Sequence, residues 1–171
     1  MEEPGRKQIR VPELYQVCIA VYDLEKSMNR YQKALGAGPW ELFTVDASSI
    51  TDMTYHGRPT QYTQKVAFTM VGPMQLELVQ PVSGDNSFRD FLREHGEGVH
   101  HLGHVRVGNI DESVRVWEKE GFACLERGRF PAGGYAYMDT VETLGVIIEL
   151  LETPEGPSPF YPPSLWKAWE R

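Results

Sequence analysis

The 171-residue sequence has few cysteines, little positive charge and no long apolar run. Its two cysteines, Cys18 and Cys124, are too few for a disulfide framework, which favours a reducing compartment. The net charge of −7 argues against binding of nucleic acid or anionic lipid, since both require a basic patch. No segment reaches the ~20 apolar residues of a membrane span, and residues 1–12 lack the apolar core of a signal peptide. We therefore expect a cytoplasmic protein without nucleic-acid or membrane partners.

The sequence does contain an internal repeat. The amphipathic helical pattern of residues 23–33 recurs at 109–119, and each copy opens with a capping residue, Asp23 or Asn109. A strand pattern precedes each helix, and a strand with a glutamate between apolar residues, Glu77 or Glu149, ends each copy. Two further strand candidates lie between helix and final strand, at 40–45 and 65–71 in the first copy and at 124–129 and 135–139 in the second. Each copy therefore follows the order βαβββ.

This repeat predicts an α+β fold built from two tandem βαβββ modules. The expected organisation is an N-terminal extension at 1–12, a first module at 13–81, a linker at 82–98, a second module at 99–153 and a tail rich in proline and aromatic residues at 154–171. Within the linker, residues 87–95 have the pattern of a short helix that ends at Gly96. The polar insertion at 46–64 is expected to form a long loop, either a lid or a disordered tip.

Period-two alternation places the two carboxylates on defined strand faces. Glu77 and Glu149 lie on the faces opposite their apolar neighbours, so they face away from the helices if the apolar faces pack on those helices. Gln16 and Cys18 share one face of the first strand. We interpret Cys18 as a small lining residue, not as a nucleophile, because the sequence assigns it no partner base. Whether the tyrosines of the strand at 135–139 line the same space or face solvent stays open.

Four segments together resemble a known family. They are QVCIAVYDL at 16–24, QLELVQP at 75–81, GEGVHHLG at 96–103 and GVIIELL at 145–151. With the repeat, they resemble the vicinal-oxygen-chelate superfamily, which includes glyoxalase I, methylmalonyl-CoA epimerase, extradiol dioxygenases and bleomycin-resistance proteins. The segment 96–103 is most similar to methylmalonyl-CoA epimerases and related glyoxalase-like proteins. The resemblance covers about residues 11–152 and implies that the modules form a curved mixed sheet, a glyoxalase-like cup around a small-molecule site.

The resemblance also implies a divalent metal ion in the cup. Carried over by position, its ligands are Gln16 and Glu77 from the first module and His101 and Glu149 from the second. Epimerase-like members have histidine where this chain has Gln16, and a glutamine carbonyl is a neutral, weaker ligand. The resulting donor set of three oxygens and one nitrogen suits Zn²⁺, Ni²⁺, Co²⁺, Mn²⁺ or Mg²⁺ and does not choose among them.

The register of the histidine strand leaves three candidates for the histidine ligand. An unbroken strand that turns Val105 toward the helix would also turn His101 that way. Either a β-bulge between His101 and Val105 corrects the register, or the ligand is His100 or His104. We favour the bulge and His101, since Gly103 can take the backbone geometry that a bulge requires.

With the resemblance, these residues imply a metal-assisted isomerase, epimerase or lyase that acts on a small carbonyl compound through an enolate-type intermediate. By resemblance, Glu149 is the catalytic carboxylate that moves the proton, and Glu77 lies on the opposite side of the substrate. The alternative is a non-catalytic protein of the bleomycin-resistance type that binds and sequesters a small molecule, which the substitution of Gln16 for histidine favours. The resemblance and the aromatic tail, with Trp166 and Trp169, also favour a homodimer.

Overall fold

The computed structural model describes residues 9, 11, 14–131 and 133–153, apart from the side chain of His104. Most of the predicted N-terminal extension and the whole tail at 154–171, with Trp166 and Trp169, lie outside the described residues. None of the described helices is long and apolar enough to cross a membrane.

Both modules contain the predicted order of strand, helix and three strands. The first module comprises β1 (Gln16–Ala20), α1 (Leu24–Leu35), β2 (Glu41–Val45), β5 (Thr63–Val71) and β6 (Met74–Ser83). The second comprises β7 (Gly98–Arg106), α3 (Ile110–Lys119), β8 (Cys124–Phe130), β9 (Gly133–Met138), the short helix α4 (Val141–Leu144) and β10 (Ile147–Glu152). The connecting helix α2 (Ser87–His95) has the bounds that the sequence predicts.

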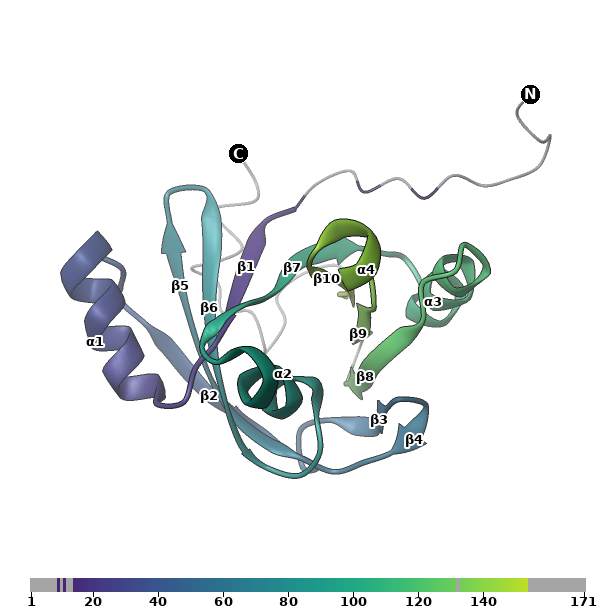
Figure 1. Ribbon diagram of the computed structural model, residues 1–171, viewed down its shortest axis with the longest axis horizontal. Helices are drawn as coiled ribbons and strands as arrows, with labels where there is room; N and C mark the ends of the chain where they lie inside the picture. The colour runs from purple at the N-terminus through teal and green to yellow at the C-terminus, as the bar shows by residue number, and fades with distance from the viewer. Residues whose placement is uncertain (1–8, 10, 12–13, 132, 154–171) are drawn as a thin grey trace.

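The described strands form one curled, open sheet in the order β2-β5-β6-β1-β7-β10-β9-β8-β3-β4 (Figure 1). In each module the first strand pairs in parallel with the last, β1 with β6 and β7 with β10. The two modules meet where β1 pairs antiparallel with β7. The last strands of both modules therefore flank the centre of the sheet, and the predicted α+β fold of two repeated modules is confirmed.

The helices α1 and α3 cover the outer face of the sheet, at opposite sides of the molecule in Figure 1. Asp23 accepts a hydrogen bond from the Lys26 amide at the start of α1, which satisfies an amide that has no partner within the helix. Apolar residues of the last strand of each module pack with its helix: Leu76 and Leu78 of β6 with α1, and Ile148 and Leu150 of β10 with α3. The alternation then turns Glu77 and Glu149 to the inner face.

The expectation of a polar loop at 46–64 is wrong. This segment contains β3 (Thr51–Tyr55) and β4 (Arg58–Pro59), which form a hairpin. Strand β3 also pairs antiparallel with β8, so an insertion of the first module extends the sheet of the second. Threonine and tyrosine favour strands, and Ile50 and Met53 are buried in the inner apolar cluster, which supplies the packing that a free polar loop lacks.

Strand β7 contains the predicted bulge between His101 and Val105. Opposite β10, Leu102 pairs with Ile148 and Val105 pairs with Leu150, so that two β7 residues face the single residue Glu149. A second register shift lies opposite β1, between the partners of Cys18 and Ile19. Because the bulges break the alternation, the neighbouring side chains of His100 and His101 are both buried in the interior.

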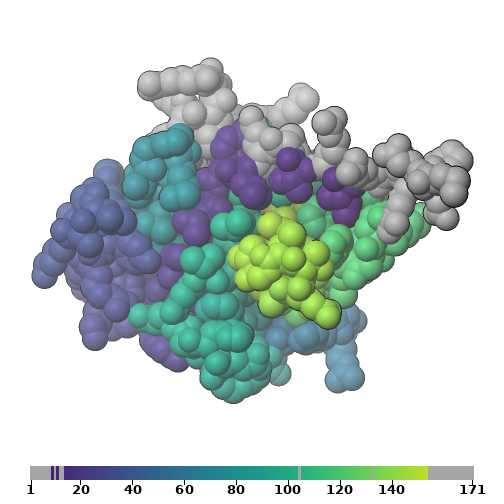
Figure 2. Space-filling model, turned by 45° about the horizontal axis from the view of Figure 1, so that its top comes forward, coloured from purple at the N-terminus to yellow at the C-terminus, as the bar shows by residue number. Residues whose placement is uncertain are grey.

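Helix α2 closes one side of the space inside the sheet. Its Phe88 is fully buried, and its ring lies edge-on to those of His101 and Tyr137. Glu126 of β8 holds the start of this helix, because its carboxylate accepts hydrogen bonds of 2.7 Å from both the amide and the hydroxyl of Ser87. In Figure 2 the teal surface of α2 and the yellow surface of α4 both lie on the face turned to the viewer.

Candidate metal centre

The structure brings the side chains of Gln16, Glu77, His101 and Glu149 together at the centre of the sheet. Strand pairing explains why: Gln16 on β1 faces Gly103 of β7, and its neighbour Cys18 faces both Glu77 and His101. All four predicted side chains lie inside the fold, with at most 7% of each residue exposed.

Their polar atoms converge on the His101 ring. His101 Nε2 lies 3.1 Å from Gln16 Oε1, 3.5 Å from Glu77 Oε2 and 3.7 Å from Glu149 Oε2. The Gln16 amide is held from behind, since its Nε2 donates a 2.8 Å hydrogen bond to Gln75 Oε1. The Gln16 carbonyl oxygen is therefore the atom turned toward the other three groups.

Gly103 provides the space in which these groups meet. A Cβ atom at this position would lie 2.5 Å from both Gln16 Oε1 and Glu149 Oε2, far inside van der Waals contact. The backbone angle φ of Gly103 lies outside the positive range that favours glycine, so conformation alone does not demand glycine here. The site therefore needs glycine at position 103 because there is no room for a side chain, and not because of its backbone conformation.

Burial makes the two carboxyl groups unusual acids. It raises the pKa of Glu77 to about 7. It also raises the pKa of Glu149 well above the ordinary range, and the nearby charge of Glu77 adds to that effect. A cation among these groups would stabilise their charged forms and reverse both shifts. Two buried carboxylates, an amide oxygen and an imidazole nitrogen thus form a donor set that fits a divalent metal ion.

His100 lies directly behind His101. The two Nδ1 atoms are 3.0 Å apart, and the His100 ring stacks on Phe88 with a centroid distance of 3.9 Å. Burial lowers the pKa of His100 to about 3, so this ring is neutral at physiological pH. Of the three histidine candidates, His101 lies among the predicted ligands and His100 contacts its far side, while the His104 side chain lies outside the described atoms.

A cavity of about 60 Å³ adjoins these residues on the inner face. Both Glu77 and Glu149 line it, together with aromatic rings that include Phe43 and Phe68. Tyr135 and Tyr137, whose orientation the sequence left open, are buried in its wall.

Sequence reasoning missed Gln64 of β5, which also lines this cavity. It is 5% exposed, and its Oε1 has no hydrogen-bond partner among the described residues. Gln64, Val66 and Phe68 are two positions apart along β5 and therefore share one strand face, and this spacing is the signal that could have placed Gln64 at the cavity.

Comparisons with known proteins agree with this fold. The sequence model of the Glyoxalase/Bleomycin resistance protein/Dioxygenase superfamily matches residues 15–138. The uncharacterized protein YqjC of Bacillus subtilis (strain 168) is 27% identical over 143 residues, which is 81% of this chain and 89% of that protein. The mitochondrial methylmalonyl-CoA epimerase of Homo sapiens is 29% identical over 141 residues, which is 80% of this chain and 72% of the human protein.

Solved structures share this fold at lower sequence identity. Methylmalonyl-CoA epimerase from Mycobacterium tuberculosis is 22% identical, with a TM-score of 0.56 over 88% of this chain and 96% of that one. A Streptomyces coelicolor methylmalonyl-CoA epimerase in complex with 2-nitronate-propionyl-CoA is 18% identical, with a TM-score of 0.55 over 88% of this chain and all of that one. These likenesses show the fold, and the sequence match spans most of the chain. The protein therefore belongs to the glyoxalase/bleomycin resistance protein/dioxygenase superfamily.

Proposed function

We propose that the protein is a metal-dependent enzyme that moves a proton at the carbon beside a carbonyl group of a small substrate, as an epimerase or isomerase does. The observation that carries this proposal is the convergence of two buried carboxyl groups, His101 and Gln16 on one space beside a cavity. The epimerases among the relatives support the same reaction class.

Gln16, Glu77, His101 and Glu149 would hold the metal ion. A bound divalent cation would supply Lewis acidity, which polarises a carbonyl oxygen and acidifies the neighbouring C–H bond. All four residues are almost fully buried, and aromatic side chains line the adjoining cavity. In such an environment fixed charges act more strongly on a substrate than they do in water.

The two carboxyl groups would carry the proton. In one direction of the reaction Glu149 would accept the proton of the substrate carbon and a protonated Glu77 would donate its own proton to the opposite face; in the reverse direction the two roles exchange. The two residues come from different modules and lie on strands on either side of the central β1–β7 pair. Carboxylates that reach two faces of one planar intermediate are what an epimerase requires. The repeated placement of Glu77 and Glu149 in the two modules supports this arrangement.

The cavity limits what reaches the carboxylates. A volume of about 60 Å³ holds only a few non-hydrogen atoms, so the reacting end of a substrate enters and the remainder stays outside. Acyl-CoA thioesters have that form, and a related epimerase binds one such analogue.

Deuterium exchange tests the proposal without knowledge of the product. Zn²⁺-, Co²⁺- or Mn²⁺-loaded protein is incubated in D₂O with a panel of 2-branched acyl thioesters and 2-hydroxy ketones, and mass spectrometry follows deuterium at the carbon beside the carbonyl. We expect exchange by the wild type with both configurations at that carbon, and Glu149→Gln to lose exchange for one configuration, the one whose C–H bond faces Glu149. Exchange of both configurations by Glu149→Gln at the wild-type rate contradicts the role of Glu149. Tight binding of panel members with no exchange at all would favour the sequestration function instead, for which the neutral Gln16 ligand is the supporting observation.

A further inference from the structure

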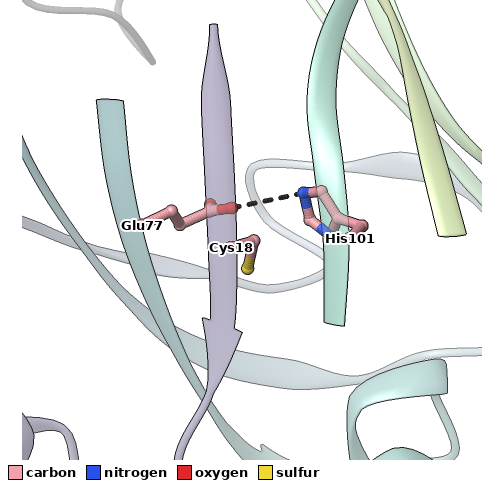
Figure 3. Close-up of side chains that lie close together, drawn as sticks. All are labelled: Cys18, Glu77 and His101. Carbon is pink, nitrogen blue, oxygen red and sulfur yellow. Dashed lines mark ion pairs between the residues drawn. The ribbon is translucent and has the colours of Figure 1, made fainter. Parts of the chain in front are cut away.

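Cys18 lies inside the candidate metal centre. It is fully buried on β1, two positions after Gln16, so both side chains extend from the same strand face. Its strand partners are Glu77 on β6 and His101 on β7. Figure 3 shows the sulfur on the central strand with Glu77 and His101 on either side.

The three side chains are close enough to share one ion. A sulfur, a carboxylate oxygen and an imidazole nitrogen, one from each residue, all lie within 4.8 Å of one another. Two ligand atoms bound to the same zinc ion are roughly 3–4 Å apart, because each lies about 2.0–2.3 Å from the metal. Shifts of about 1 Å within the existing rotamers would therefore bring the three atoms into one coordination shell.

We propose that Cys18 is a metal ligand, so that the centre is a thiolate site selective for Zn²⁺ or Co²⁺ over Mg²⁺ and Mn²⁺. The proposal rests on the metal centre of the proposed function and names the ion that it takes. Thiolate is a soft ligand that Zn²⁺ and Co²⁺ accept and that Mg²⁺ and Mn²⁺ bind poorly. A charged sulfur also compensates for the weak, neutral carbonyl of Gln16.

Binding replaces the thiol proton by the metal. The S–H bond breaks, the metal–sulfur bond forms, and the proton would pass to the neighbouring Glu77 carboxylate or to solvent. Burial and the charge of Glu77 raise the pKa of the free Cys18 thiol well above its ordinary value.

Cys124 provides a matched control within the same chain. It lies on β8, packed beside the outer cluster under α3, and its sulfur is hydrogen-bonded to the Glu126 carbonyl. Its place on the outer side of the sheet separates it from the candidate ligands.

The test is titration of metal-free protein with Co²⁺, followed by absorption spectroscopy. A cobalt–sulfur bond gives a charge-transfer band in the near ultraviolet that oxygen and nitrogen ligands do not give. We expect one equivalent of Co²⁺ to produce the band in wild type and in Cys124→Ser, and Cys18→Ser to bind Co²⁺ without it. We further expect Cys18→Ser to lose at least about tenfold in Zn²⁺ affinity while its Mn²⁺ affinity changes little.

Two other outcomes have different meanings. Stoichiometric Co²⁺ binding by wild type without the band would overturn the role of Cys18 and leave the proposed metal centre standing. Absence of Co²⁺ binding by wild type would overturn both. A band that persists in Cys18→Ser and disappears in Cys124→Ser would assign the sulfur to a different site and contradict the proposal. Circular dichroism of each variant verifies that the fold is retained.

Discussion

Replacing Gly103 by valine fills the space between the Gln16 and Glu149 side chains. A Cβ atom there already approaches one oxygen of each to 2.5 Å, about 0.9 Å short of the 3.4 Å at which ordinary contact begins. Both oxygens must therefore move by about 1 Å, and the additional methyl groups of valine increase this displacement. Metal sites tolerate deviations of only ~0.2 Å in ligand distance. Two of the four proposed ligands are thus displaced by a single substitution.

We expect Gly103→Val to weaken Zn²⁺ binding at least about 100-fold, which is about 2.8 kcal/mol. The fold should persist, because the displaced atoms are the ends of flexible side chains and valine suits a strand. Isothermal titration calorimetry measures the affinity. The control is Gly108→Val, a nearby exposed position at which a Cβ atom meets nothing within 4 Å. Equal Zn²⁺ affinity of the two variants would refute the inference that Gly103 provides room for the ion.

Two further predictions concern buried groups next to the centre. If His101 binds the metal through Nε2, its Nδ1 carries the proton and donates it to His100 Nδ1. His100→Leu should therefore weaken Zn²⁺ binding about 10- to 100-fold, whereas His100→Asn, which retains an acceptor near the Nδ1 position, should recover most of the affinity. Calorimetry that shows no loss of Zn²⁺ affinity for His100→Leu would contradict this positioning role. Burial raises the pKa of Glu126 from 4.5 to about 7 in the folded state, so its protonated form stabilises the fold and stability is lost as pH rises through that window. Urea denaturation should show that metal-free wild type loses on the order of 3 kcal/mol in unfolding free energy relative to Glu126→Gln between pH 4.5 and 7, and little more above pH 7. A difference in unfolding free energy between the two proteins that does not change with pH would refute this linkage.

Local patterns in the sequence were sufficient for the elements of the repeat. The alternation around Glu77 and Glu149 placed these residues on the inner face, and the mismatch between the histidine strand and Val105 predicted the bulge in β7. Helix α2 was also predictable from its apolar spacing and from Gly96 at its end.

Contacts between distant segments were not predictable in the same way. The hairpin β3–β4 is polar in sequence, and its strand character depends on pairing with β8, more than 60 residues away in the chain. The contact of Cys18 with His101 likewise depends on the register of the β1–β7 pair, in which Cys18 lies opposite His101 next to a register shift. The inward turn of His100 has the same origin, because a bulge places two consecutive side chains on one side of a strand.

The proposed metal centre is tested most directly by the metal content of protein purified without chelator or added metal. Inductively coupled plasma mass spectrometry of wild type is compared with a variant that carries both Glu77→Ala and Glu149→Ala. We expect close to one equivalent of a divalent metal in wild type and almost none in the double variant. Wild type that contains no metal, and takes up none from millimolar Zn²⁺, Co²⁺, Ni²⁺ or Mn²⁺, would contradict the proposed metal centre.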